Sequence, residues 1–365
     1  MIYLDNSATT KPRTEVLETF MKANEQYYAN PASLHQMGNE AEDLLENARE
    51  QIKRILNMEH VIFTSGGTES NNLALFGAAR ANRHRGKHII SSATEHPSVL
   101  NSLKELEKEG FEITILNVNS SGEISLDELK NALRNDTILV SLMHVNNEIG
   151  TIHPIAEVKA LLQESRTLLH VDAVQSIGKI QLNANSMPDL LTVSGHKIHG
   201  LKGSGVLAFN QLELSAVQFG GGQESGLRSG TVSVPHAAAF AKALRLAEPN
   251  PAFADWNKEL REFFSEFAGV KVVSPNGAAP HILAVAVKGV KGEILVSGLQ
   301  TESVIVSTSS ACSSKNKKAS HVIEAIGLSR EYKDGVMRIS FGAFTTAEDI
   351  ARLKEAFTNM HKLIK

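Results

Sequence analysis

The feature that most constrains the fold is a repeated alternation of short apolar runs with longer, charged segments. The longer segments, such as ESNNLALFGAARANRH and IAEVKALLQES, have helical periodicity. The apolar runs, rich in Val, Ile and Leu, are HVIFTS, KHIISS, ILVSLMHV, TLLHVDAV and LLTVSG. Such alternation is typical of strand and helix units around a mostly parallel sheet, which holds its ligands at the carboxyl ends of the strands. The sequence therefore predicts an α/β fold with functional residues directly after these runs.

A second style of sequence begins near residue 259. It contains a helical segment ELREFFSEFAG, the strand-like runs VKVVS, HILAVAVKG and VMRISF, and a last helix AEDIARLKEAFTNMHKLI. This pattern predicts a smaller α+β domain, and a length of 365 residues also favours about two domains. The segment AEPNPA at 247–252, with two prolines, is a candidate boundary or a loop within one domain. In SLDELKNAL, Ser125 ahead of Glu128 has the pattern of a capping box.

Composition excludes several classes of function. The chain has 37 Lys and Arg against 40 Asp and Glu, so it lacks the basic surplus that neutralises phosphates, and nucleic acid is not the expected main ligand. The single cysteine cannot form an intramolecular disulfide. The first ten residues do not resemble an export signal, and no apolar run reaches about 18 residues. We therefore expect a cytoplasmic protein without a membrane span.

One strand end carries the sequence FTSGGTESNN. The turn at Gly66, Gly67 and Thr68 opens a helix, and a helix N-terminus presents free N–H groups and a positive dipole end that suit a phosphate. The turn lacks the Walker lysine and the three-glycine dinucleotide fingerprint. A glycine-rich turn without any ligand remains the alternative.

Two further strand ends carry a carboxylate and an amine. Asp172 and Gln175 follow the run LLHV, and a buried carboxylate at such a place needs a partner such as a cationic ring nitrogen, or caps a helix. Ser194, His196 and Lys197 follow the run LLTV, where desolvation turns a lysine into an amine nucleophile unless it is simply solvated. A phosphate cradle, an anion for a ring nitrogen and an amine for an aldehyde are together the parts that hold pyridoxal 5′-phosphate.

At this point the sequence resembles the cysteine desulfurases of the NifS/IscS type, within the class V aminotransferase group. The resemblance runs in order from residue 3 to beyond residue 340 and rests on YLDNSATT, NPASLH, TSGGTESNN, TEHPSV, HVNNEIGT, HVDAVQSIGK, SGHKIHGLKGSGVL, RSGT, SSACSS and RISFG. It implies the fold type I of pyridoxal phosphate enzymes, as in aspartate aminotransferase. The large cofactor domain would then span 15–257, and the small domain 1–14 and 258–365.

The resemblance also implies roles for individual residues. Lys197 would form the Schiff base with the cofactor and move the substrate Cα proton, Asp172 would pair with the pyridinium nitrogen, and His96 would stack on the ring and handle protons of the substrate thiol. The remaining cofactor positions are phosphate contacts at Gly67, Thr68, Ser194 and His196, ring-oxygen contacts at Asn147 and Gln175, and a phosphate contact from the other subunit at Thr231. The last of these implies a homodimer.

For the substrate, L-cysteine, the resemblance implies that Arg338 clamps the carboxylate bidentately with help from Asn30. Without the family motifs, His96 before Pro97 would be interpreted as a helix-capping loop residue, and Arg338 as part of a surface ion pair. His196 and His199 are three residues apart, but no further ligand or HExxH signature accompanies them, so no metal site is expected.

The only cysteine, Cys312, lies in STSSACSSKNKK. A thiol is a good nucleophile as thiolate, which needs exposure and positive neighbours, and the nearby serines and Lys315, Lys317 and Lys318 supply both; a buried inert cysteine is the alternative. In the family this residue takes the substrate sulfur as a persulfide and passes it on. The three lysines are expected to lower the Cys312 pKa or to receive an acidic acceptor surface. The serine-rich setting resembles the branch with a long mobile cysteine loop.

Two departures from the family pattern affect no reacting group: Ala32 stands where serine is frequent, and Ser309 where glycine is frequent. The resemblance implies that the persulfide sulfur passes to an acceptor protein, which would be an iron–sulfur scaffold, a tRNA-thiolation enzyme or a thiazole-pathway carrier. Three alternatives stay open: a related pyridoxal phosphate lyase, such as a selenocysteine lyase, or aminotransferase that does not need Cys312; a non-catalytic scaffold; and, least favoured, a nucleotide-binding dehydrogenase, since no glycine fingerprint follows an early strand.

Overall fold

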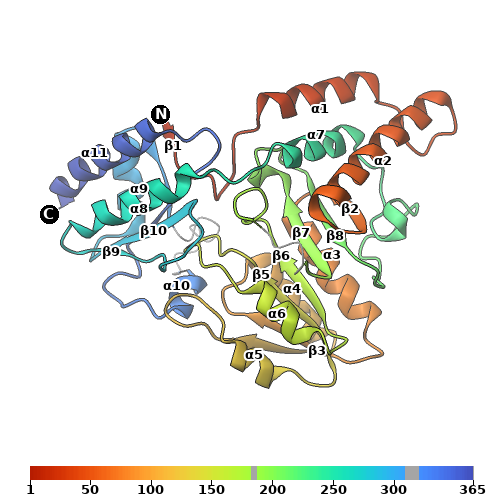
Figure 1. The fold of residues 1–365 in the computed structure, drawn as a ribbon, viewed down its shortest axis with the longest axis horizontal. Coiled ribbons are helices and arrows are strands. Elements are labelled where there is room, and N and C mark those ends of the chain that lie inside the picture. Colours follow the sequence, from red (N-terminus) through yellow and green to blue (C-terminus); the bar gives the residue numbers. More distant parts are fainter. Residues whose placement is uncertain (182–186, 309–319, 365) are drawn as a thin grey trace.

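A seven-stranded sheet forms the centre of the molecule. The computed structural model describes residues 1–181, 187–308 and 320–364 (Figure 1). The strand order is β2-β8-β7-β6-β5-β3-β4, and only β8 runs antiparallel to its neighbours. The strands are β2 (His60–Thr64), β3 (His88–Ser92), β4 (Glu112–Leu116), β5 (Thr137–Met143), β6 (Leu168–Asp172), β7 (Leu190–Ser194) and β8 (Gly205–Phe209). Six strands therefore end at the same edge of the sheet.

Helices cover both faces of this sheet because its strands alternate apolar side chains between two buried clusters. Phe63 and Val193 lie in one cluster, whereas Ile62 and Leu190 lie in the other. The first cluster is covered by α1 (Thr14–Gln26), α2 (Gln36–Leu56), α5 (Leu126–Ala132), α6 (Ile155–Leu162) and α7 (Val234–Arg245). The second is covered by α3 (Gly67–Ala81) and α4 (Pro97–Lys108). The result is a three-layered α/β/α arrangement.

The C-terminal part forms a second, smaller sheet with its own core, at the left in Figure 1. Its strands are all antiparallel, in the order β12 (Ser307–Thr308), β13 (Val336–Ser340), β10 (Ile282–Val287) and β9 (Val270–Val272). The helices α8 (Ala252–Ser265), α9 (Gly292–Thr301) and α11 (Ala347–Ile364) pack on it, and α10 (His321–Ala325) lies nearby. Phe264, Phe341 and Phe357 are among the fully buried side chains of this core. The expected α/β fold with a smaller α+β part is confirmed.

The N-terminal segment joins the two parts. The strand β1 (Ile2–Tyr3) pairs in parallel with β11 (Val304–Ile305), and Leu4 is buried in the C-terminal core. Farther along, the N–H of Thr10 donates to the carbonyl of His196 at 2.9 Å, at the edge of the large sheet. Since Phe253 of α8 also lies in the C-terminal core, we propose a domain boundary close to 247–252, with the first residues on the small-domain side.

Local signals explain several element boundaries. The Ser125 hydroxyl accepts the N–H of Glu128 at 3.2 Å and so begins α5, as the capping pattern predicts. The Glu128 side chain instead accepts the N–H of Asn117 at 3.5 Å, so the bond from the Ser125 N–H that would complete a capping box is not seen among the described contacts.

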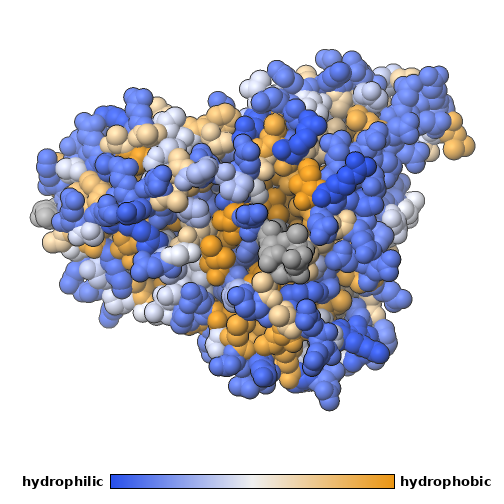
Figure 2. All heavy atoms as spheres, viewed as in Figure 1, coloured by the Kyte–Doolittle hydropathy of each residue, from blue (hydrophilic) through white to orange (hydrophobic). Residues whose placement is uncertain are grey.

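Figure 2 shows a surface that is hydrophilic over most of its outer parts. Among the described residues, no helix has the length and apolarity that crossing a bilayer requires.

Candidate active site

Five strand ends of the large sheet deliver polar residues to one edge. Because β8 is the only reversed strand, the ends of β2, β3, β5, β6 and β7 lie on the same side. The residues at or shortly after these ends are Gly66 and Gly67, His96, Asn147, Asp172 and Gln175, and Ser194, His196 and Lys197. The structure thus brings together most of the site residues that the sequence predicts.

Lys197 ends a short 3-10 helix, η2 (Gly195–Lys197), directly after β7. Its Nζ donates to the backbone carbonyl of Ala8 at 2.8 Å and to that of Ser7. The turn requires glycine at position 195, since a Cβ there would lie 2.3 Å from the Ser204 hydroxyl. The amine is therefore held at the sheet edge by the N-terminal segment.

The carboxylate of Asp172 is held by two donors. Its Oδ1 accepts the N–H of Val174 at 3.0 Å, and its Oδ2 accepts Nδ2 of Asn71 at 2.8 Å. The same Asn71 nitrogen donates to the Ser98 hydroxyl at 2.9 Å. Asn71 was not assigned a role from the sequence, although it stands in the SGGTESNN motif, one helical turn after Gly67.

His96 caps α4 with its Nδ1. That nitrogen accepts the N–H of Ser98 at 3.1 Å and lies 2.8 Å from the Ser98 hydroxyl, so the neutral ring carries its proton on Nε2. Burial lowers the pKa of His96, Asp172 acts in the opposite direction, and Lys197 and His321 lower the pKa further. His96 can therefore cap α4 and also act in the site, because the cap uses only Nδ1 and leaves Nε2 for another contact.

The turn before α3 lies close to the end of β7. Gly66 has φ +152° and ψ −177°, a conformation that favours glycine, and a Cβ at Gly67 would lie 2.9 Å from Val174 Cγ2. A Cβ at Gly66 would lie 3.8 Å from the Ser194 hydroxyl, which is buried and has no hydrogen-bond partner among the described residues. Thr68 is exposed in the first turn of α3. A free hydroxyl beside free helix N–H groups is suited to a phosphate.

His196 lies next to the active-site lysine. Its Nδ1 is 3.2 Å from the Thr9 hydroxyl, and burial, with Lys197, Lys179 and Lys202 adding to the effect, lowers the pKa of His196 to about 4. The ring is therefore neutral at pH 7. No group of three or more metal-ligating side chains is found in the described parts of the chain, which include His196 and His199.

Arg338, on β13 of the small sheet, reaches the same edge. It is 3% exposed; one terminal nitrogen donates to the Asn147 carbonyl at 2.8 Å and the other to Asp5 at 2.9 Å. Its Nε is buried and has no partner within the described ranges. A buried guanidinium with an unused donor differs from the surface ion pair that the sequence left open, and it suits a small carboxylate ligand.

Two predicted residues, Asn30 and Thr231, lie outside this cluster. Asn30 is exposed in the loop between α1 and α2, and its Oδ1 accepts the N–H of Ala32 at 3.0 Å. Thr231 is exposed on the loop before α7. Cys312, with the three lysines after it, lies outside the described residues. The structure brings neither Asn30 nor Thr231 into contact with Lys197 of the same chain in any described hydrogen bond.

The described residues on either side of 309–319 flank the site. Ser307 is opposite Arg338 in the pairing of β12 with β13. On the other side, the Ser320 hydroxyl donates to Glu148 at 2.5 Å, and His321 Nε2 lies 2.8 Å from the Glu95 carbonyl. Glu95 and Glu148 follow the ends of β3 and β5, so Ser320 and His321 lie at the edge of the large sheet.

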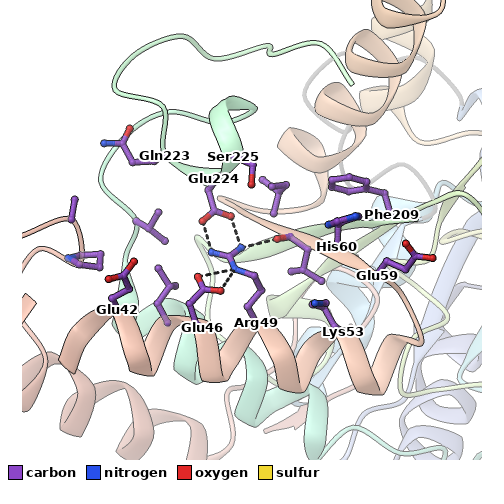
Figure 3. Close-up of a pocket in the computed structure, with 16 residues that line it drawn as sticks. Glu42, Glu46, Arg49, Lys53, Glu59, His60, Phe209, Gln223, Glu224 and Ser225 are labelled. Atoms are coloured by element: carbon purple, nitrogen blue, oxygen red, sulfur yellow. Dashed lines mark hydrogen bonds and ion pairs between the residues drawn. The ribbon is translucent and has the colours of Figure 1, made fainter. Parts of the chain in front are cut away.

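A separate pocket of about 320 Å³ lies away from these strand ends, between α2, β2 and the loop before α7. Figure 3 shows Arg49 between Glu46 and Glu224, with Glu224 coming from that loop. The Glu224 carboxylate accepts Arg49 at 2.7 and 2.9 Å and the N–H of Phe63 at 2.7 Å. Both oxygens of the Glu224 carboxylate thus accept hydrogen bonds from the protein. This ion pair therefore anchors the loop that continues to Thr231.

Comparison with known proteins identifies the family. The family model described as aminotransferase class-V matches residues 2–353. The chain belongs to the class-V aminotransferase family. It is 41% identical to a NifS/IcsS protein homolog of Lactobacillus delbrueckii subsp. bulgaricus, over 99% of this chain and 97% of the relative. It is 40% identical to the cysteine desulfurase IscS of Dictyoglomus turgidum, over 96% of this chain and 91% of the relative.

Solved structures agree with this assignment. A NifS-like protein superposes with a TM-score of 0.89 at 33% identity, covering 99% of both chains. A structure described as SspA in complex with cysteine superposes with a TM-score of 0.84 at 33% identity, covering 95% of this chain and 100% of the other. The expected fold of the pyridoxal phosphate transferases is therefore confirmed, and the class-V family implies pyridoxal phosphate as cofactor.

The residues of this member of the class-V aminotransferase family fit that cofactor. The Ser194 hydroxyl, which has no partner among the described residues, and the Gly66–Gly67 turn suit its phosphate. The fixed Asp172 carboxylate suits a ring nitrogen, and Lys197 supplies an amine. The glycine turn without a ligand, which the sequence left open, does not account for the buried free hydroxyl beside it.

Proposed function

We propose that this protein is a cysteine desulfurase, which removes sulfur from L-cysteine and leaves L-alanine and a persulfide on Cys312. The observation that supports it most is the convergence of Lys197, Asp172 and the Gly66–Gly67 turn at one sheet edge, beside the buried Arg338. The cysteine desulfurase names of relatives at about 40% identity point to the same substrate.

Each side chain has a task in the proposed reaction. Bound pyridoxal phosphate supplies an electron sink. Lys197 would hold the cofactor and move a proton at the substrate Cα, and Asp172 would keep a cationic ring nitrogen paired. Arg338 would bind the substrate carboxylate through its free Nε together with groups that now donate to Asn147 and Asp5.

His96 and Cys312 would complete the chemistry at sulfur. His96 Nε2, the nitrogen not used in the helix cap, would take or return the proton of the substrate thiol. The Cys312 thiolate would attack that sulfur. The carbon–sulfur bond then breaks, a sulfur–sulfur bond forms on Cys312, and the released methylene carbon gains a proton to give the methyl group of alanine. The positions flanking residues 309–319, at Ser307 and Ser320, support this placement.

The remaining expectations extend the proposal to partners. The exposed Thr231, on a loop anchored by Glu224, would reach the cofactor phosphate of the partner subunit in a homodimer. The persulfide would be handed to an acceptor protein of iron–sulfur cluster assembly or tRNA thiolation, in the cytoplasm.

Mass spectrometry tests the proposal directly. After incubation of the pyridoxal phosphate-loaded protein with L-cysteine, we expect one additional sulfur on the peptide that contains Cys312. The variant Cys312→Ser should keep the yellow cofactor and form almost no sulfide from cysteine. Unchanged turnover in Cys312→Ser would indicate a lyase or aminotransferase. A protein that gains no visible band with pyridoxal phosphate, and on which borohydride fixes no cofactor at Lys197, would be a non-catalytic scaffold.

A further inference from the structure

A second lysine, Lys179, lies behind the candidate site and contacts Gln175. Its Nζ donates to Oε1 of Gln175 at 2.7 Å, from four residues farther along the chain. The turn after β6 holds the two residues in place, because the N–H of Lys179 donates to the Ser176 carbonyl at 3.0 Å. Gly178 has φ +70°, and a Cβ there would lie 2.4 Å from Ala247.

This contact determines which end of the Gln175 amide faces the site. An amide has one acceptor end and one donor end, and the acceptor end is engaged by the lysine. The Nε2 therefore points the other way, where it donates to the Ser7 carbonyl at 2.9 Å. The same carbonyl accepts Nζ of Lys197. The donor end of Gln175 thus lies beside the amine that would hold the cofactor.

The surroundings of Lys179 do not indicate that its charge stabilises the folded protein. Within the described ranges it forms no salt bridge, and the charged groups that act on it are Lys197 and Arg338. Burial and these two cations lower the pKa of Lys179 well below its usual value. Placing an amine in a partly buried position near two cations costs stability, and the described contact that accounts for its position is the bond to Gln175. An amine donates to Oε1 in either protonation state.

We propose that Lys179 is a positioning residue, which fixes the Gln175 amide so that its NH2 group faces the ring oxygen of pyridoxal phosphate. This inference rests on the proposed function, in which Gln175 contacts that oxygen. A donor at this place stabilises an anionic ring oxygen, whereas a rotated amide would present its own oxygen and repel it. Lys179 then acts on the cofactor only through Gln175.

A double-mutant cycle on the full-length protein tests the inference. Apoprotein of the wild type, Lys179→Met, Gln175→Ala and the double variant is titrated with pyridoxal phosphate, and the dissociation constant and the position of the visible band are measured. We expect Lys179→Met to weaken binding by about five- to tenfold and to shift the band. In the Gln175→Ala background the same change should alter binding less than about twofold.

The controls separate positioning from folding. Lys271→Met removes a lysine from the exposed edge of β9 and should leave the band and the affinity unchanged. Lys179→Arg keeps a donor and should restore the wild-type band. If Lys179→Met does not fold, as judged by apoprotein melting, Gln175→Glu replaces the donor end with an acceptor and should weaken binding at least as much.

Wild-type affinity for pyridoxal phosphate and a wild-type band in Lys179→Met or in Gln175→Glu would overturn the inference. So would a loss of affinity on Lys179→Met that is the same in the wild-type and Gln175→Ala backgrounds. Cofactor binding and sulfur transfer by the wild-type protein distinguish failure of this inference from failure of the proposed function. Wild-type protein that binds pyridoxal phosphate and places sulfur on Cys312, combined with a normal Lys179→Met, removes only the inference. Wild-type protein that binds no pyridoxal phosphate removes both.

Discussion

Two buried polar regions of this molecule differ in how completely their atoms are paired. Around Arg49 and Glu224, each carboxylate oxygen accepts from the guanidinium, and one also accepts a backbone N–H. At the edge of the large sheet, buried polar atoms lack partners among the described residues, namely Ser7 Oγ, Asn71 Oδ1, Ser194 Oγ and Arg338 Nε. Since folding normally pairs buried polar atoms, the first region is built for stability and the second for a ligand.

The largest effect is expected where the paired region is broken. Arg49→Ala leaves the Glu224 carboxylate, whose side chain is 1% exposed, without its cation, and should reduce the free energy of unfolding by about 3 to 5 kcal/mol. Urea unfolding of the apoprotein measures it. The matched control is Glu46→Ala, which removes the exposed partner of the same arginine and should cost less than about 1 kcal/mol. Equal costs for the two variants would contradict the assignment of Glu224 as a buried anchor.

An intermediate effect is expected from His199, whose two ring nitrogens are also paired. Nδ1 donates to the Lys11 carbonyl at 2.8 Å, and Nε2 accepts the N–H of Ala343 at 2.9 Å, so the neutral ring connects the two parts of the molecule. Burial lowers the pKa of His199 to about 4, below its value of about 6.5 in the unfolded chain.

A histidine whose pKa is lowered by folding stabilises the protein fully above the unfolded pKa and loses that contribution as pH falls toward the folded value. Between pH 7 and pH 5, His199 should contribute a loss of about 2 kcal/mol to the free energy of unfolding. His199→Asn should reduce the pH dependence of urea unfolding over this range by that amount, whereas substitution of the exposed His84 should leave it unchanged. An unchanged slope in His199→Asn would show that the ring is protonated in the folded protein.

The smallest effect on stability is expected in the unpaired region. Ser194→Ala removes a buried hydroxyl without a described partner, so the apoprotein should be as stable as the wild type or more stable by about 1 kcal/mol. The affinity for pyridoxal phosphate should fall about fivefold, because a net hydrogen bond is worth about 1 kcal/mol. Thermal melting and cofactor titration measure the two quantities, with the exposed Ser265→Ala as control. A clear loss of apoprotein stability would show that the Ser194 hydroxyl forms a stabilising hydrogen bond within the protein.

The sequence predicted the strands and the residues at their ends well, because both follow from local patterns. The runs HVIFTS, KHIISS and LLTVSG coincide with β2, β3 and β7, and Lys197 and Asp172 stand where parallel strands end. The reversed direction of β8 could not be predicted, since the apolar alternation of Gly205–Phe209 is the same for either direction. That direction matters, because it returns the ends of β2 and β7 to the same edge.

Contacts between distant parts of the chain were beyond prediction for a similar reason. Arg49 and Glu224 are 175 positions apart, and nothing in either local sequence indicates the other. Asn71 and Lys179 both stand inside motifs that the sequence singled out, yet their roles depend on which side-chain atom faces which neighbour. A charged residue four positions after Gln175 was the available signal for Lys179.

The hold on Lys197 by the Ser7 and Ala8 carbonyls has a consequence for how the protein matures. Those carbonyls are themselves placed by β13, since the N–H of Ser7 donates to the Ser340 hydroxyl at 2.8 Å across 333 positions. Residues near Ser7 must therefore wait for residues near Ser340, which are made much later, before Lys197 is held in place. Contacts of such long sequence separation slow folding. A chain in which either Ser7 or Ser340 is not yet in place would lack the contacts that position Lys197.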